Sequence, residues 1–301
     1  MMTAASQNAL AETYQEFVRP RRAISSIRDF ARQKPLAAVG GLVVLALIIL
    51  SIVGPWVAPY SYDGFDIAAR FQGPSTQHWF GTDDQGRDQF SRVLFGARTS
   101  VVVAFSTTLI TTIFSGMLGA ISGYVGGMFD TILQRILEIW QAFPGLIFLI
   151  FVVSILGPSE LNVIITISLL LTAGTSRIIR SAAIALRSQV FVESAKSLGA
   201  SPTRILIFHV IPNLFPVVII SASVQIGAVI IIESSLSFLG FGVPPPHPTW
   251  GGMLQDSQRF MREYPYLAVF PGAAIAIVVY SFNILGDGIR DVLDPRMRGS
   301  R

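Results

Sequence analysis

Long stretches without a charged side chain limit the folds that this chain can adopt. A helix that crosses a bilayer needs about 20 mostly apolar residues, and inside lipid its backbone must satisfy its own hydrogen bonds. Stretches of about this kind occupy residues 36–54, 99–129, 139–159, 161–176, 205–232 and 264–286. The fourth is short, and we expect it to continue past Arg177, whose long side chain can reach the membrane surface. The pattern predicts an all-α polytopic membrane protein with six transmembrane helices.

The composition agrees with this fold class and excludes several kinds of site. Hydrophobic residues make up 51% of the chain and charged residues only 13%, whereas a soluble domain carries about 25% charged residues. The chain has no cysteine. Disulfide bonds, thiolate metal sites and cysteine nucleophiles are therefore excluded.

The spacing of the apolar stretches divides the chain into segments. The first stretch follows about 35 residues of tail and ends in GPWVAPY, so we expect a retained membrane anchor and not a cleaved signal peptide. The expected segments are a cytoplasmic tail at 1–35, a first transmembrane helix at 36–57, a small extracytoplasmic segment at 58–97, a five-helix core at 98–290 with an external loop at 240–263, and a cytoplasmic tail at 291–301.

The distribution of Lys and Arg predicts the orientation. If the N-terminus is cytoplasmic, sixteen of the 22 basic side chains fall on the inside and six on the outside. Cytoplasmic loops carry an excess of Lys and Arg. We therefore expect both termini on the cytoplasmic side of the membrane.

A polar helical hairpin at 188–205 interrupts the apolar stretches. Its central sequence FVESAKSLGASPTRI predicts a helix of about two turns over 191–198. Gly199 follows where a left-handed helix end is least costly for glycine. Ser201 and Pro202 suit the first positions of a second helix. Phe191, Ala195 and Leu198 share one face by their spacing, and we expect them to form an apolar ridge.

Two interpretations of the hairpin remain open from the residues alone. It could lie on the bilayer surface as an amphipathic loop, or it could dock a soluble partner. Glu193 stands beside Lys196, which weakens attraction to anionic lipid and leaves the two interpretations about equal.

Several motifs together resemble one family of membrane proteins. Glu193, Ala195 and Gly199, followed after nine residues by the sequence HVIP that ends at Pro212, resemble the EAA loop of ABC-importer permeases. Ser194 stands where the usual motif has alanine. The stretches FGTDDQGRDQFSRVLFGARTS, SLSFLGFGVPPPHPTWGGML and FNILGDGIRDVLDPR resemble the dipeptide, oligopeptide and nickel permeases, specifically the second permease of the pair. The resemblance extends from about residue 35 to near the end of the chain.

The resemblance implies a role and a set of partners. It implies a type I importer permease that translocates peptides, or a related solute such as nickel complexes or oligosaccharides. A homologous second permease, two cytoplasmic ATPases and an extracytoplasmic binding protein would complete the transporter, with no nucleic acid. The resemblance also implies that the lipid membrane is the cytoplasmic (inner) membrane of a prokaryote. The hairpin would be the coupling helix. Its expected coupling residues are Glu193, Ser194, Ala195, Leu198, Gly199, Ala200 and Ser201.

The chain itself carries no ATP-binding motif. A P-loop of the form GxxxxGK[ST] requires a lysine, and the only two lysines lie in the contexts ARQKP and SAKSL. The sequence also contains no HExxH zinc motif and no GxSxG motif. We therefore expect a non-catalytic subunit with no cofactor, catalytic residue or metal of its own, and with ATP and Mg²⁺ on the partner ATPases.

The remaining polar residues have more ordinary interpretations. The cluster at 83–92 lacks the spacing of a calcium loop, so we expect its Arg and Asp side chains to pair and tie turns together. Arg135 and Glu138 are three apart and are expected to pair on a helix surface. His209 is expected to be a structural group. Glu233 is a weak candidate for the substrate path, because an acid at membrane depth is often functional.

A stand-alone secondary transporter or channel is the alternative function. Such carriers often have ionisable residues inside their membrane helices and inverted repeats. The apolar stretches here are nearly free of charge and show no evident repeat. The sequence therefore favours the importer permease.

Overall fold

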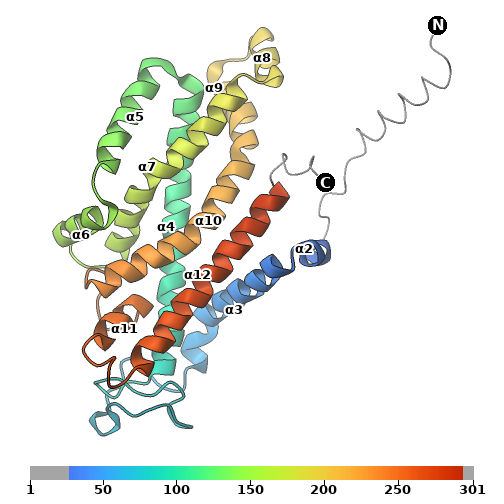
Figure 1. Cartoon of the computed structure of the whole chain (residues 1–301). Coiled ribbons are helices and arrows are strands. Elements are labelled where there is room, and N and C mark those ends of the chain that lie inside the picture. Colours follow the sequence, from blue (N-terminus) through green and yellow to red (C-terminus); the bar gives the residue numbers. More distant parts are fainter. Residues whose placement is uncertain (1–26, 294–301) are drawn as a thin grey trace, which may run out of the picture.

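The computed structural model describes residues 27–293 and consists of helices joined mostly by short connections, with one long irregular segment at residues 58–88 (Figure 1). Within this range, two opposed residues, Thr82 and Asp88, form an isolated bridge outside any strand. The helices are α2 (Ile27–Gln33), α3 (Pro35–Val57), the 3-10 helix η1 (Ile67–Ala69), α4 (Gln89–Val125), α5 (Gly127–Gln141), α6 (Gly145–Leu156), α7 (Glu160–Arg187), α8 (Val190–Ser197), α9 (Pro202–Ile205), the π-helix η2 (Leu206–Val210), α10 (Ile211–Phe238), α11 (Trp250–Ser257) and α12 (Tyr266–Leu293).

Five helical segments are long and apolar enough to cross a membrane. They are α3, α4, α7, the continuous run from α9 to α10, and α12. The pair α5 and α6 passes the same test only when taken together, and it bends by 86° at the break between its helices. The described chain therefore has five spans, or six when the bent pair counts as one, and the predicted all-α membrane fold is confirmed.

The expected third span is wrong as a single straight helix. The apolar stretch at 139–159 is divided between the end of α5 and the whole of α6. Pro144 lies at the N-cap of α6, and a residue that precedes proline avoids the helical conformation. The helix therefore stops before Pro144 and starts again in a new direction.

Two other boundaries differ from the sequence expectation. The stretch at 99–129 contains a break at Gly126 and Gly127, both with positive φ, so α4 ends at Val125 and Phe129 belongs to α5. At its other end α4 begins at Gln89, inside the segment 58–97 that we expected to be extramembrane. Asp88 caps this helix by accepting a hydrogen bond from the Ser91 backbone N–H at 2.8 Å.

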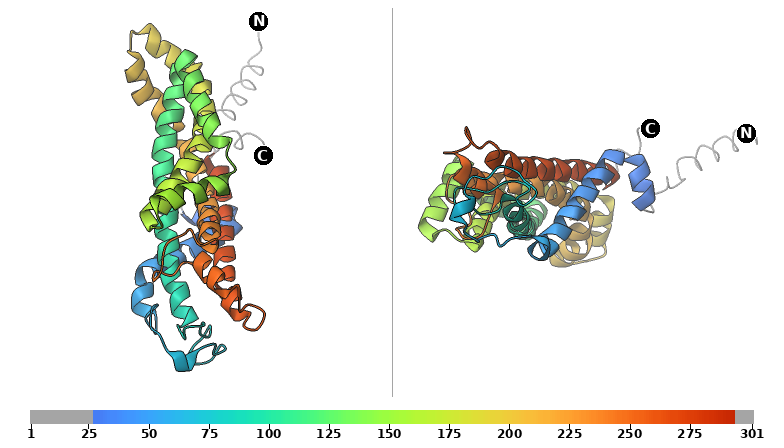
Figure 2. Two further views of the ribbon diagram at one scale, coloured as in Figure 1. Left: turned by 90° about the vertical axis from the view of Figure 1, so that its left-hand side faces the viewer. Right: turned by 90° about the horizontal axis from the view of Figure 1, so that it is seen from below.

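The bundle is elongated and has two different ends. Helices α8 and α9 form one end, which we call the hairpin end (Figure 1). Helix α11 and the irregular segment at residues 58–88 form the opposite end, which we call the loop end, and a second direction shows the same separation (Figure 2). A central buried cluster joins the bundle helices, with members such as Leu47, Val103, Ile167, Val229 and Phe282.

Candidate functional site

The hairpin end has the backbone that its sequence predicts. Helix α8 ends at Ser197, and Gly199 follows with a φ of +78°. The backbone N–H of Ala200 donates to the Ala195 carbonyl at 3.1 Å, and that of Gly199 donates to the Lys196 carbonyl at 2.9 Å. This pair of bonds is the Schellman arrangement, which satisfies carbonyls at a helix end.

The second helix of the hairpin also begins as expected. The Ser201 side chain accepts a hydrogen bond from the Arg204 backbone N–H at 3.4 Å, and Pro202 occupies the first turn. A π-helix follows at Leu206–Val210, and it passes directly into α10. The hairpin is thus continuous with the long span on its C-terminal side.

The apolar ridge expected on α8 is wrong in part. Ala195 does not lie on the exposed face, because it is buried together with Val192. The exposed apolar side chains are instead Val190, Phe191 and Leu198, and Leu198 is 88% exposed. Phe191 and Leu198 are therefore presented outward as expected, whereas Ala195 belongs to the inner face.

The buried face attaches the hairpin to the spans. Val192 and Ala195 share a buried cluster with Ile179 and Ala183 of α7 and with Val210 of the π-helix. On the other side, Glu193, Ser194, Gly199 and Ser201 are exposed, and Ala200 is partly buried. Only residues 188 and 189 separate α7 from α8. The hairpin therefore presents an exposed cap that is closely attached to two long helices.

The π-helix places His209 at the junction of the hairpin and α10. The side-chain amide of Asn213 donates to the His209 carbonyl at 2.6 Å. This bond involves only the backbone of His209, so the expected structural role of the His209 side chain stays a prediction.

An ion pair below the hairpin was not foreseen. Arg180 of α7 donates through Nε to Asp130 of α5 at 2.6 Å. Ser122 of α4 also bonds to Asp130, and Gln134 donates to the Ser122 hydroxyl at 3.2 Å. The group joins α4, α5 and α7 near the base of α8. The only sequence signal was an acid in the first turn of α5, shortly after Gly126 and Gly127.

We expect Asp130→Asn to destabilise the fold more than loss of a surface ion pair does. The change weakens a charged hydrogen bond in a partly buried site, at a cost of about 2 kcal/mol in the free energy of unfolding. Arg135→Gln is the matched control, because Arg135 pairs with Glu138 at 2.8 Å on an exposed surface and such pairs contribute about 0.5 kcal/mol or less. Thermal unfolding in detergent measures the stability of both variants. Equal losses of stability in the two would contradict the expected difference.

Glu233 lies in the interior of the fold. It is 1% exposed, and the hydroxyl of Ser237 donates to it at 2.6 Å. Ser234 donates to the same carboxylate at 3.4 Å. Its role in a substrate path stays a prediction.

The charged cluster at 83–92 ties a turn, as expected. The Arg87 guanidinium donates to Asp83 at 2.6 Å, and the Arg87 backbone N–H donates to the same carboxylate at 2.9 Å. Across residues 27–293, no three His, Asp or Glu side chains come together as a metal site.

Comparison with known proteins assigns the family. The family described as "Binding-protein-dependent transport system inner membrane component" matches residues 115–299, which is more than half of the chain. The chain belongs to this permease family. The N-terminal membrane domain of oligopeptide transport permease C also matches, at residues 27–74.

The sequence of the permease aligns with those of named relatives over almost its whole length. It is 40% identical to a dipeptide transport system permease protein, DppC, of Alkalihalophilus pseudofirmus, over 92% of both chains. It is 41% identical to a glutathione transport system permease protein, GsiD, of Escherichia coli, over 90% of both chains. A structure of the inward-facing MetNI methionine ABC transporter is similar in fold, with a TM-score of 0.57 at 14% identity over 67% of this permease and 96% of that chain.

Proposed function

We propose that this permease is one of two membrane subunits of an ATP-driven importer of peptides. The proposal rests on the hairpin, which carries exposed apolar side chains on a capped helix and is attached to two spans. A short rigid helix can transmit the movement of a docked partner to the helices behind it. The names of the dipeptide and glutathione relatives support a peptide as the solute.

The orientation follows from the same proposal. The hairpin end faces the cytoplasm of a prokaryotic cell, both termini lie inside, and the loop end faces outward toward a substrate-binding protein. Two partner ATPases hold ATP and Mg²⁺, and a second permease completes the pathway. This chain contributes no catalytic group and converts ATPase closure into movement of α7 and α10.

Leu198→Asp tests the docking face of the hairpin. Leu198 is 88% exposed, and burial of a leucine side chain in an interface contributes about 2 kcal/mol, or about thirtyfold in affinity. An aspartate there adds a charge without disturbing the buried face. We expect the variant to retain the second permease and to lose the ATPases when it is purified in mild detergent and its partners are identified by mass spectrometry.

Ile67→Asp is the matched control at the loop end. Ile67 is 79% exposed, so the same charge is added to a similarly exposed apolar residue far from the hairpin. We expect this variant to keep both partners. Retention of the ATPases by Leu198→Asp would refute docking at this face, and recovery of the wild-type chain alone would refute the importer proposal itself.

A further inference from the structure

Two arginines at the loop end are paired very differently. Arg87 is held within its own turn by Asp83 at 2.6 Å. Arg92, in the first turn of α4, is only 4% exposed, yet its Nε and Nη1 atoms have no hydrogen-bond partner. Its nearest carboxylate oxygens are those of Asp256 at 3.4 Å and Asp83 at 3.8 Å. A charged hydrogen bond between nitrogen and oxygen is usually 2.7–2.9 Å long, so Arg92 is buried with most of its donors unsatisfied.

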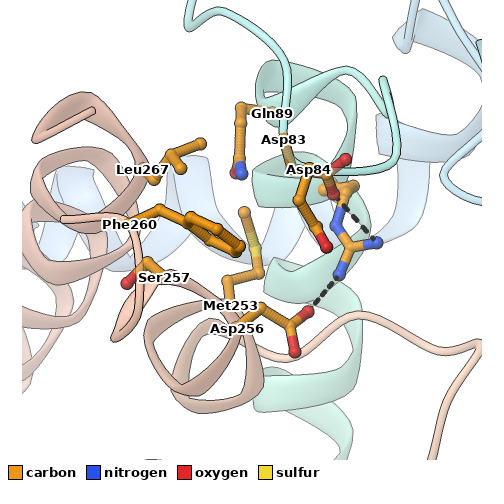
Figure 3. Close-up of a pocket in the computed structure, with 9 residues that line it drawn as sticks. Asp83, Asp84, Gln89, Met253, Asp256, Ser257, Phe260 and Leu267 are labelled. Carbon is orange, nitrogen blue, oxygen red and sulfur yellow. Dashed lines mark hydrogen bonds and ion pairs between the residues drawn. The ribbon is translucent and has the colours of Figure 1, made fainter. Parts of the chain in front are cut away.

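The surroundings of Arg92 are shielded from water on one side. Asp83 and Asp256 point toward the same space from different elements, and Met253, Phe260 and Leu267 lie across from them (Figure 3). Shielding strengthens electrostatic attraction and raises the cost of an unpaired polar group. An unsatisfied guanidinium in such a place favours an anion that can supply two oxygens.

An adjoining cavity has room for a ligand. Its volume is about 200 Å³. Arg87 and Arg92 line it, with His247 from the proline-rich loop and Gln255 and Asp256 from α11. Both arginines donate to one oxygen of Asp256 at 3.4 Å. Arginine has a planar fork of donors that matches a carboxylate in a bidentate arrangement, which Asp256 does not use.

Asp256 is weakly held at this position. Its side chain is 49% exposed. Burial raises the pKa of Asp256 above its usual value, and the attraction of Arg92 and Arg87, which lowers it, does not compensate fully. The carboxylate is thus an incomplete partner for two arginines and can be replaced by a better one.

Helix α11 is attached to α4 at both of its ends. At the first residue, the Trp250 indole N–H donates to the Val93 carbonyl at 3.0 Å. Near the last residue, Asp256 contacts Arg87 and Arg92. Loss of the second attachment would release the last turn of α11 from α4, while Trp250 and the packing of the helix on α10 and α12 keep the rest of α11 in place.

We propose that this cavity binds a free carboxylate of the transported solute, which replaces Asp256 on Arg87 and Arg92 and releases the end of α11 from α4. The inference rests on the proposed function as a peptide importer, since every unmodified peptide carries a C-terminal carboxylate. It assigns a recognition role to the loop end and identifies the charge that is recognised.

A cysteine at Ser257 reports the release of α11. Ser257 is 2% exposed, and this chain has no other cysteine. The assembled transporter carrying Ser257→Cys is placed in lipid nanodiscs without binding protein, and labelling by a charged maleimide is followed by mass spectrometry of this chain. We expect dialanine to raise the labelling rate about fivefold or more, the lower range of ordinary coupling between sites, and dialanine amide to leave it unchanged.

Variants in the Ser257→Cys background identify the groups responsible. We expect Asp256→Asn to label rapidly without peptide, and Arg92→Gln to lose its response to dialanine. Arg259→Gln is the matched control, because it removes an arginine from an exposed position three residues after Asp256, and its response should equal that of the unaltered background.

Three results would overturn the inference. The first is an equal rise in the labelling rate with dialanine and with dialanine amide. The second is a normal response to dialanine in Arg92→Gln. The third is a rise in labelling that occurs only after binding protein is added and that does not depend on the peptide carboxylate. If ATP-driven peptide uptake stays normal while the labelling does not respond, only the carboxylate site is refuted. If the wild-type transporter shows no ATP-driven peptide uptake, the proposed function itself is refuted.

Discussion

Gly199→Asp is expected to abolish coupled transport and to leave the membrane fold intact. Gly199 has a φ of +78°, and the space around its missing side chain is empty. The substitution therefore causes no clash, but the left-handed backbone costs about 1 kcal/mol. A carboxylate at the C-terminus of α8 adds up to about 1 kcal/mol through the helix dipole. The exposed cap would lose its geometry, and peptide uptake should fall about tenfold or more.

Gly157→Asp is a close control for this variant. Gly157 follows α6 with a φ of +84°, and it too has empty space around it. The charge at a helix end is therefore matched, far from the hairpin, and the backbone strain is greater in the control, because Gly157 has a ψ of +154° in a region almost restricted to glycine. Both variants are compared by their peptide uptake and by the amount of ATPase in the purified complex. Equal losses of uptake in the two would contradict a specific role of the hairpin, and normal uptake by Gly199→Asp would exclude it as the coupling helix.

Gly123→Val is expected to destabilise the whole bundle. A β-carbon at Gly123 would lie 2.5 Å from the Arg180 carbonyl oxygen and 2.7 Å from the Ala183 β-carbon. The first contact is with backbone, so no side-chain rotation relieves it, and α4 and α7 must move apart. Overpacking of this kind costs up to about 3 kcal/mol, and we expect the midpoint of thermal unfolding to fall by about 5–10 °C.

Gly116→Val on the same helix separates packing from helix propensity. The space around Gly116 is open, so valine there meets nothing and changes only the intrinsic preference of α4. We expect its unfolding midpoint to stay close to that of the wild type. A similar loss in both variants would show that glycine itself, and not the close approach of α7, sets the stability of α4.

Close packing of α4 on α7 also explains the position of the hairpin. Arg180 lies opposite Gly123 and pairs with Asp130. One turn further along α7, Ala183 enters the buried cluster that holds Val192 of α8. A disturbance at Gly123 should therefore reach the coupling region, and uptake by Gly123→Val should fall together with stability.

Local features of the fold and site were predictable because their causes are local. The apolar stretches identified the regions of the spans, since hydropathy depends only on adjacent residues. The glycine turn at Gly199 and the cap at Ser201 were predicted correctly, because both follow from the conformational preference of one residue. The bend at Pro144 was present in the sequence but was not recognised, because the apolar stretch continues across it.

The sequence by itself determined the all-α membrane class, the regions of the spans and the capped hairpin. Tertiary structure alone decided which polar groups meet. Asp130 and Arg180 are 50 residues apart and Arg92 and Asp256 are 164 apart, so no local pattern relates them. It also decided that Ala195 faces inward while Leu198 stays exposed. The physical reason is that partners distant in sequence, and the buried side of a short helix, are set by how the long helices pack.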